Sequence, residues 1–348
     1  MKKALSILTA GCLAVSLAAC GSTAASSAAS AADSTASSAA ESTAASDTAA
    51  ADGQTYKVGI CQLVQHVALD AATQGFKDAL TEQLGDAVTF EEKNAQGDSN
   101  TCTTIINGFV SDNVDLILAN ATPALQAAQA GTNTIPVLGT SVTEYGVALG
   151  IDDFDGLVGT NISGTSDLAP LDEQAGIIKE LFPDAKTVGL LYCSAEPNSQ
   201  YQVDTVKASL EELGYTCEYY AFSDSNDLAT VCQSAADASD VIYVPTDNTV
   251  ANNTEIVNNI CQPAGVPVVA GEEGIMSGCG VATLSISYYD LGVATGKMAK
   301  ARLRRSPLST LRSSLRNTTR PLPKLWASPS QMIMWHTRAK QPERPALI

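Results

Sequence analysis

Six short polar segments of the chain contain the side chains best able to bind or transform a small molecule. They are rich in hydroxyl, amide and carboxylate groups, and they lie at 62–66, 120–124, 139–143, 193–199, 245–249 and 271–274. Several begin a predicted helix, where free N–H groups favour an anion such as a carboxylate. Thr122, Ser194 and Thr246 can add hydroxyl donors, whereas Asp247 and Glu272 can balance an ammonium group. Together these groups predict a site for a small zwitterion.

The residues that we expect to contact the ligand come from both halves of the chain. They are Gln62, His66, Thr122, Thr143, Ser194, Asn198, Thr246, Asp247, Asn248 and Glu272. Some of them have a purely structural interpretation as well. His66 is equally suited to a structural hydrogen bond, and Asp247 can cap the helix that begins beside it. Glu272 and Glu273 can form an acid–base pair, but we favour a loop in which one carboxylate contacts the ligand and the other is solvated.

The same residues do not assemble into a recognisable reaction centre. His66 is the only histidine between residues 56 and 300, and as a base it would need a nucleophile and an orienting partner that we do not find. The sequence has no glycine-rich phosphate loop and no metal-ligand spacing. We therefore predict that the protein is not an enzyme and has no catalytic residue, metal or cofactor.

The polar segments follow stretches that predict β-strands, and helical stretches lie between them. The order strand, helix, strand, helix, strand, helix, strand occurs twice. The predicted strands are 56–63, 88–92, 114–119, 135–138, 187–192, 216–221, 241–244 and 266–270, and the predicted helices are 68–84, 99–111, 123–131, 168–181, 199–213, 227–238, 250–264 and 290–300. Such alternation implies parallel sheets with helices on both faces, with ligands beyond the carboxyl ends of the strands. We predict an α/β fold of two doubly wound parallel-sheet lobes that are joined by a hinge and enclose a cleft.

The first 55 residues predict export and tethering. Lys2 and Lys3 precede a short apolar stretch, which is typical of a secretory signal and too short for a permanent membrane span. This signal, 1–20, ends in the letters LAAC, which resemble the lipobox of bacterial lipoproteins and predict lipidation of Cys20; an ordinary signal peptide is the alternative. Residues 21–55 are mostly Ser, Ala and Thr, and they predict a disordered linker because they can bury little apolar surface.

Charge divides the chain near residue 300. The formal net charge is −17, yet every arginine lies after residue 300. The acidic body argues against nucleic-acid binding, which needs clustered Lys and Arg. One interpretation of 301–348 is a basic tail that binds a membrane or a partner. We hypothesise instead that it is a disordered product of a frameshift, because suitable codons for 317–331, read one base earlier, encode an amphipathic helix and a strand. An intact frame across codons 290–305 would overturn this hypothesis.

Seven of the nine cysteines remain once the signal peptide and Cys20 are set aside. They are Cys61, Cys102, Cys193, Cys217, Cys232, Cys261 and Cys279. An odd number leaves at least one unpaired, and there is no C-x-x-C or zinc spacing. We expect free, mostly buried thiols that pack as small apolar side chains.

A series of motifs in order along the body supports a family resemblance. They are QLVQHVALD at 62–70, NAQGD at 94–98, ATPA at 121–124, GTSD at 164–167, SAEPNS at 194–199, VPTDNT at 244–249 and EEG at 272–274. Residues 56–300 thereby resemble the solute-binding proteins of ABC transporters, in the branch that includes tryptophan- and tyrosine-associated binding lipoproteins. The resemblance implies a type I periplasmic-binding fold, with crossovers that we place near 164–167 and 284–289. We assign 56–163 to lobe 1, 164–286 to lobe 2 and 287–300 to a return to lobe 1.

The resemblance also implies a function. We expect an extracytoplasmic lipoprotein, anchored to the cell membrane through Cys20, that captures a small solute between its lobes and delivers it to an ABC permease. The implied ligand is an aromatic amino acid, with Tyr145, Phe154, Tyr288 or Tyr289 as candidates for the pocket wall. The protein is expected to be a monomer with no nucleic-acid partner. The alternatives are a ligand-sensing lipoprotein that signals to a membrane receptor and an enzyme on the same frame.

Overall fold

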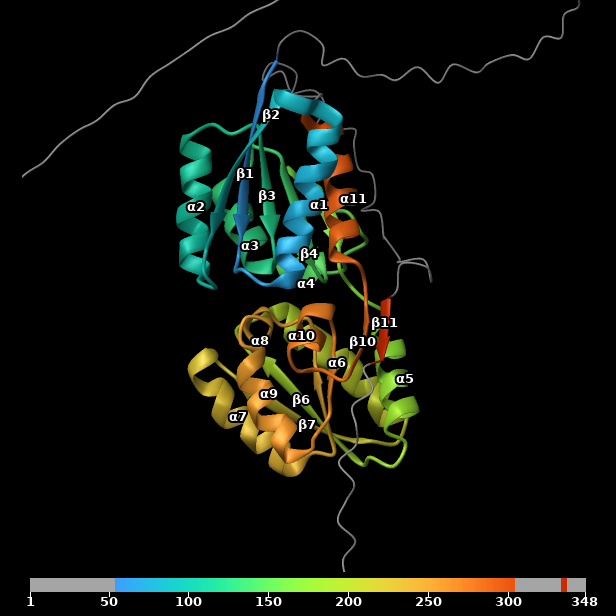
Figure 1. Cartoon of the computed structure of the whole chain (residues 1–348). Helices are drawn as coiled ribbons and strands as arrows, with labels where there is room; N and C mark the ends of the chain where they lie inside the picture. Colours follow the sequence, from blue (N-terminus) through green and yellow to red (C-terminus); the bar gives the residue numbers. More distant parts are fainter. Residues whose placement is uncertain (1–53, 304–332, 337–348) are drawn as a thin grey trace, which may run out of the picture. The chain divides into compact units, whose positions relative to one another are not determined.

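The computed structural model describes residues 54–303 and 333–336, which form two α/β lobes (Figure 1). The predicted signal peptide, the lipidation site Cys20, nearly all of the linker and most of the basic tail lie outside the described residues. Among the helices that the structure describes, none is long and apolar enough to cross a membrane.

Lobe 1 contains a parallel five-stranded sheet in the order β2-β1-β3-β4-β5. Its strands are β1 (Tyr56–Gln62), β2 (Val88–Asn94), β3 (Leu116–Asn120), β4 (Val137–Val142) and β5 (Ile162–Ser166). Its helices are α1 (Val67–Leu84), the short 3-10 helix η1 (Gly85–Ala87), α2 (Ser99–Ser111), α3 (Thr122–Gly131), α4 (Tyr145–Leu149) and α11 (Tyr288–Leu303). Strand side chains alternate between the faces, so Ile60 packs with α1 and α11 whereas Cys61 packs with α2 and α3.

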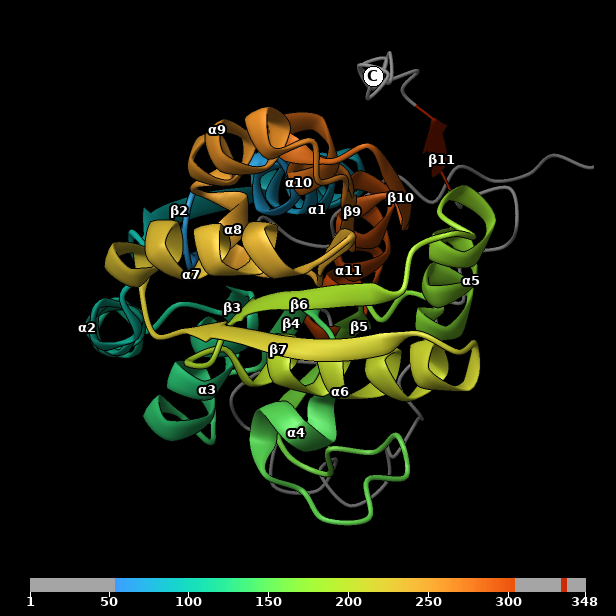
Figure 2. The same ribbon diagram turned by 90° about the horizontal axis from the view of Figure 1, so that it is seen from below.

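Lobe 2 repeats this architecture with the strand order β11-β10-β9-β8-β6-β7, in which only β11 is antiparallel. Its strands are β6 (Thr187–Cys193), β7 (Thr216–Phe222), β8 (Val241–Val244), β9 (Val268–Ala270), β10 (Ala282–Ser285) and β11 (Ile333–His336). Its helices are α5 (Leu171–Leu181), α6 (Pro197–Glu212), α7 (Ser225–Ala238), α8 (Asn248–Ala251), α9 (Thr254–Ala264) and α10 (Glu273–Cys279). One face is covered by α5 and α6 and the other by α7 and α9 (Figure 2). The predicted fold class is therefore confirmed.

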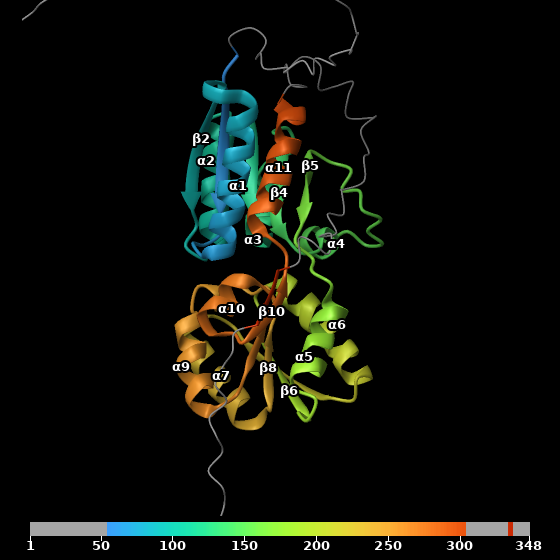
Figure 3. The same cartoon turned by 45° about the vertical axis from the view of Figure 1, so that its right-hand side comes forward.

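Helix α11 returns from lobe 2 and packs along α1 in lobe 1 (Figure 3). Two glycines allow the helices to approach this closely. A Cβ on Gly292 would lie 2.0 Å from the carbonyl oxygen of Ala72, and one on Gly75 would lie 2.1 Å from that of Tyr289. No other residue fits at either position unless the helices separate.

Three elements extend past the predicted boundaries. Strand β5 pairs with β4 as far as Ser166, beyond the lobe boundary that we place at 163. Helix α11, whose start is predicted at 290–300, runs from Tyr288 to Leu303. The segment 301–348 is not wholly unstructured, because β11 adds to the edge of β10. The letters IMWH of β11 combine β-branched and aromatic residues, which have high β-propensity.

All seven cysteines of the body are free thiols, as the sequence predicts. Six are buried and Cys279 is partly exposed. The sulfur atoms of Cys232 and Cys261 lie 3.7 Å apart in the core between α7 and α9.

Candidate functional site

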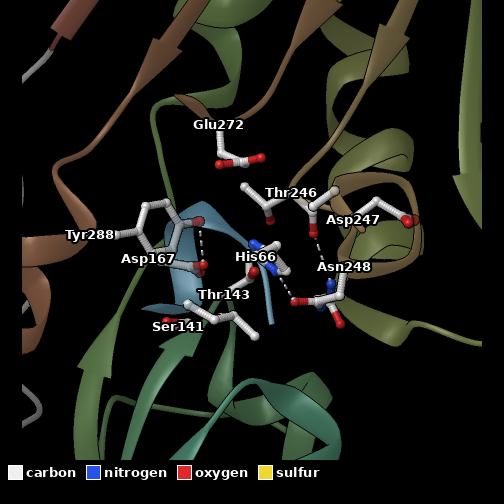
Figure 4. Close-up of a pocket in the computed structure, with 12 residues that line it drawn as sticks. His66, Ser141, Thr143, Asp167, Thr246, Asp247, Asn248, Glu272 and Tyr288 are labelled. Atoms are coloured by element: carbon white, nitrogen blue, oxygen red, sulfur yellow. Dashed lines mark hydrogen bonds between the residues drawn. The ribbon is translucent and has the colours of Figure 1, made fainter. Parts of the chain in front are cut away.

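One pocket is lined by residues of both lobes at the carboxyl ends of their strands (Figure 4). The space between these residues is about 280 Å³ including the part open to solvent, and only about 10 Å³ of it is accessible to the centre of a water-sized molecule. The lining residues are His66, Leu69, Ser141, Thr143, Asp167, Asn198, Thr246, Asp247, Asn248, Ala251, Glu272 and Tyr288. The pocket thus lies where an open α/β sheet is expected to bind its ligand.

The lobes touch through side chains around this pocket. The Nε2 atom of His66 in lobe 1 lies 3.2 Å from Oδ1 of Asn248 in lobe 2. The Nε2 atom of Gln202 in α6 lies 3.5 Å from the hydroxyl of Thr143 and 2.6 Å from that of Thr246. The structure is therefore a closed form in which loops of both lobes meet.

The structure brings seven of the ten predicted ligand contacts together in the pocket wall. They are His66, Thr143, Asn198, Thr246, Asp247, Asn248 and Glu272. The other three lie outside the lining. Gln62 binds Thr73 and Asp70 within lobe 1, Thr122 is buried at the start of α3, and Ser194 donates to the carbonyl of Phe222.

Two of the buried carboxylates in the wall accept hydrogen bonds from backbone N–H groups. Asp247 accepts hydrogen bonds from the N–H groups of Cys193 and Val250 and caps α8. Glu272 caps α10 with both of its oxygens. Burial raises the pKa of each to about 7, and the nearby Glu196 carboxylate adds to the effect at Asp247. The helix-capping interpretation of Asp247 is confirmed, and each oxygen of both carboxylates already accepts one backbone N–H.

Asp167 is the third carboxylate in the pocket wall, and it is the one with an oxygen that accepts no hydrogen bond. It follows β5 where the chain leaves lobe 1, and its Oδ2 accepts a hydrogen bond of 2.8 Å from the hydroxyl of Tyr288 (Figure 4). Its Oδ1 is buried and has no partner. Burial raises the pKa of Asp167, which means that a nearby positive charge would be strongly favourable. Asp167 therefore joins Asp247 and Glu272 as a candidate counter-ion for an ammonium group.

Three further polar atoms in the wall are buried without a partner. They are Nδ1 of His66, Oδ1 of Asn198 and the hydroxyl oxygen of Ser141. The side-chain amide nitrogen of Asn198 donates to the carbonyl of Thr246, so the unpartnered Oδ1 is an acceptor. Buried polar atoms are normally hydrogen-bonded, and those left over in a pocket indicate where a ligand binds. Such a ligand must supply hydrogen-bond donors.

The rest of the wall is apolar or aromatic. Leu69 and Ala251 contribute alkyl surface, and Tyr288 contributes a ring. Of the other aromatic candidates, Tyr145 is buried and bonds the carbonyl of Thr165, whereas Tyr289 is exposed. The pocket therefore combines a polar end with a surface against which an apolar group can pack.

Five lining residues were absent from the predicted contact set, namely Leu69, Ser141, Asp167, Ala251 and Tyr288. Ser141 lies in a polar segment that the sequence did single out. Tyr288 was among the four aromatic candidates for the pocket wall, whereas Asp167 follows β5 at a predicted crossover and was not among the predicted contacts. Asp167 could have been found from the sequence, because it is a charged residue in the segment 164–167 that we predict as a crossover.

The charges in the pocket wall and the absence of a metal-binding group among the described residues limit the kinds of ligand that can bind. No Lys or Arg is among the lining residues. Within 54–303 and 333–336, no group of three or more His, Cys, Asp or Glu side chains is arranged to hold a metal ion. The pocket thus has a net excess of acceptors and negative charge.

Two closing α/β lobes with a polar pocket at their strand ends define the type I periplasmic-binding fold, and solved structures agree. The structure of an ABC domain in complex with L-Trp from Streptococcus pneumonia has a TM-score of 0.71 at 32% identity, covering 77% of this chain and 88% of that one. A ligand-free, open substrate-binding protein with adhesive properties from Clostridium difficile has a TM-score of 0.57 at 36% identity, covering 80% and 91%.

Sequence comparison identifies the family. Residues 57–313 match the ABC transporter substrate binding protein family, and the chain belongs to it. It is also 37% identical over 245 residues to a "Tyrosine-binding protein" of Clostridioides difficile (strain R20291), covering 70% of this chain and 71% of that protein. Membership of a substrate-binding family confirms the prediction that the protein is not an enzyme.

Proposed function

We propose that the protein captures an aromatic amino acid between its lobes and delivers it to an ABC permease. The observation that carries this proposal is the set of unpartnered buried atoms in the pocket wall. Asp167, His66 and Asn198 all present acceptors there, and Asp167 adds a negative charge. An α-ammonium group supplies three N–H donors and a positive charge, so it complements this set.

The rest of an amino acid also finds partners in the pocket. The hydroxyls of Ser141 and Thr143 are donors for a carboxylate, which needs no Lys or Arg if enough hydroxyl groups reach it. Tyr288, Leu69 and Ala251 supply the surface for an aromatic side chain. Two relatives support this choice, since one is named for tyrosine and the other is solved with L-Trp.

Closure of the lobes is the proposed signal to the permease. The ligand stabilises the closed state because it contacts both lobes at once, and a partner that recognises this state reads ligand occupancy. The fold resembles the L-Trp complex more than the open, ligand-free protein, although its sequence identity to the open protein is higher. This difference supports the view that the closed arrangement is the bound-like state.

A binding panel tests the ligand. Thermal shifts are measured for the full chain with each of the twenty amino acids, with purines and with sugars. Tyrosine, tryptophan or phenylalanine should stabilise the fold selectively, by about 2.7 kcal/mol at a hundred times the Kd. A folded protein that responds to none of the aromatic amino acids, or equally to all the solutes, would contradict the proposal.

We further propose that a lipid on Cys20 holds the monomeric protein at the outer face of the cell membrane. The support is the LAAC sequence at residues 17–20 together with family membership. In a bacterial host, labelled palmitate should enter the wild-type chain and not the C20A variant, which should be released from the membrane fraction. Equal labelling of both chains would exclude this anchor.

Ligand affinity should depend on pH through Asp167. The carboxylate must be ionised to attract an ammonium, and burial raises its pKa. Affinity should therefore fall as pH drops through this raised pKa, by about tenfold per unit once the group is mostly protonated. Asp247 and Glu272 line the same pocket with pKa values of about 7, whereas burial lowers the pKa of His66.

Calorimetric titrations with tyrosine between pH 8 and pH 5 measure this dependence. The D167N variant should lose most of the slope, because its side chain does not ionise. A wild-type affinity that stays constant over this range, or a slope that D167N retains, would show that Asp167 is not the group responsible.

A further inference from the structure

Glu196 lies just before α6 and is not part of the pocket wall. We propose that it is a positioning residue that determines specificity: it orients two asparagine amides so that the pocket presents acceptors, and not donors, to the ligand's ammonium group. This inference rests on the proposed function, and it assigns the residue that would set the pocket's preference for an amine.

The Glu196 side chain is surrounded by hydrogen-bond donors. Its Oε1 accepts from the backbone N–H and the hydroxyl of Thr249, at 2.9 and 2.8 Å. Its Oε2 accepts from the backbone N–H and the side-chain amide of Asn248, at 3.0 and 2.7 Å, and from the side-chain amide of Asn198 at 3.4 Å. Glu196 is only 5% exposed, so water does not compete for these contacts. A carboxylate only accepts, and both asparagines must therefore turn their NH₂ groups towards it.

The first consequence concerns Asn198. Its NH₂ group is committed to Glu196 and to the carbonyl of Thr246, 3.1 Å away. Its Oδ1 is consequently the atom left buried and unpartnered at the pocket wall. The amide thus faces the ligand as an acceptor.

The second consequence reaches across the lobes to His66. Because the NH₂ group of Asn248 faces Glu196, its Oδ1 faces Nε2 of His66 at 3.2 Å (Figure 4). That Nε2 must carry the proton and donate, which leaves the lone pair on Nδ1. Nδ1 is buried and unpartnered, and the ring belongs to the pocket wall. One carboxylate therefore sets the polarity of acceptors in both lobes.

The arrangement favours an amine over its isosteres. An ammonium satisfies acceptors that otherwise stay buried without a partner, whereas an analogue without the amino group leaves them unpaired. Sites built in this way reject the analogue that lacks the hydrogen-bonding group far more strongly than sites that read shape alone. The predicted readout is the ratio of affinities for tyrosine and for 3-(4-hydroxyphenyl)propionate, which lacks the amino group.

The E196Q variant keeps the size of the side chain and adds an NH₂ group among donors. The new NH₂ group then points at the NH₂ group of Asn248, and two donors cannot bond each other. The Asn248 amide is therefore expected to turn, so that its NH₂ group faces Nε2 of His66. The imidazole must in turn move its proton to Nδ1, where a donor opposes the ammonium of the ligand. Tyrosine affinity should fall by at least about tenfold more than that of the desamino analogue, which corresponds to a difference of about 1.4 kcal/mol.

The experiment records ¹⁵N-detected imidazole spectra and both affinities for the full chain. Only two histidines occur, His66 and His336, so the H336Q variant assigns the signals. Wild type should show the Nε2–H tautomer at His66, and E196Q should show a larger share of Nδ1–H. E144Q is the matched control, because Glu144 likewise precedes a helix, α4, and accepts a backbone N–H there, but it is not part of the pocket wall. It should change neither the tautomer nor the affinity ratio.

Two results would overturn the inference: an Nδ1–H tautomer in the wild type, or an E196Q variant whose tautomer and affinity ratio match those of E144Q. The tautomer measurement needs no ligand, so it remains decisive even if aromatic amino acids do not bind and the proposed function fails. If E196Q does not fold, N248A removes the acceptor for His66, and the same rise in Nδ1–H is expected.

Discussion

Replacing Asp167 with Asn is expected to weaken the binding of tyrosine or tryptophan by about a hundredfold or more. Removing one partner of a buried, hydrogen-bonded charge pair costs about 2–5 kcal/mol of binding free energy. Tyr288 donates to Oδ2 of Asp167, so the new amide would keep its oxygen on that hydrogen bond. Its NH₂ group would then replace the unpartnered Oδ1 and oppose the ligand's ammonium.

Calorimetry of the full chain measures this loss, and the empty protein provides a check on folding. Wild type buries a carboxylate with one unpaired oxygen, which is unfavourable without a ligand. The empty D167N protein should therefore melt no lower than wild type. D172N is the control, since Asp172 is an exposed residue in the first turn of α5. If D167N and D172N bind tyrosine equally well, Asp167 is not the ammonium partner.

The second large effect is expected at Gly292, where α11 packs against α1. The G292A variant places a methyl group 2.0 Å from the carbonyl oxygen of Ala72, so the helices must separate. We expect a loss of about 3 kcal/mol in the free energy of unfolding, because overpacking a tight contact costs about 1–3 kcal/mol or more. Urea denaturation of the full chain measures it.

Gly176 is the matched control for this substitution. It lies inside helix α5, and apart from the backbone of that helix and its two chain neighbours a Cβ there would meet no atom within 4 Å. The G176A variant should therefore gain about 0.5–1 kcal/mol from the higher helix propensity of alanine. Equal stability changes for G292A and G176A would mean that the α1–α11 contact adapts without cost.

The fold was predictable because strand and helix patterns alternate without ambiguity. Buried strands such as β3 are continuous apolar runs, and helices such as α1 have apolar residues at helical spacing. The elements that escaped prediction lack these signals. Strand β5 reads ISGTS, with one large apolar residue, and α10 is a seven-residue helix that follows directly after β9. Their structure depends on the neighbouring strand or cap and not on local periodicity.

The site was predictable only in part, for a related physical reason. Residues that follow a parallel strand reach the same edge of the sheet, so Thr246 and Asn198 lie where the topology predicts. Which way a side chain turns is decided by its nearest partners. Ser194 turns back to a strand carbonyl, and Glu272 turns to its own helix. Asp167 faces the pocket where the return of α11 to lobe 1 brings Tyr288 beside it, and no single segment encodes that contact.

The return of α11 to α1 also has a consequence for the order in which the chain folds. Apart from β11, lobe 2 is a continuous stretch, whereas the two helices of this contact are about 200 residues apart in the chain. Contacts between distant segments form slowly because the intervening chain must first close a large loop. A chain synthesised from its N-terminus therefore begins lobe 1 first and completes it last. Until residue 303 has emerged, the face of α1 that carries Gly75 has no partner, and the first lobe stays incomplete while the parallel strands of the second are already able to fold.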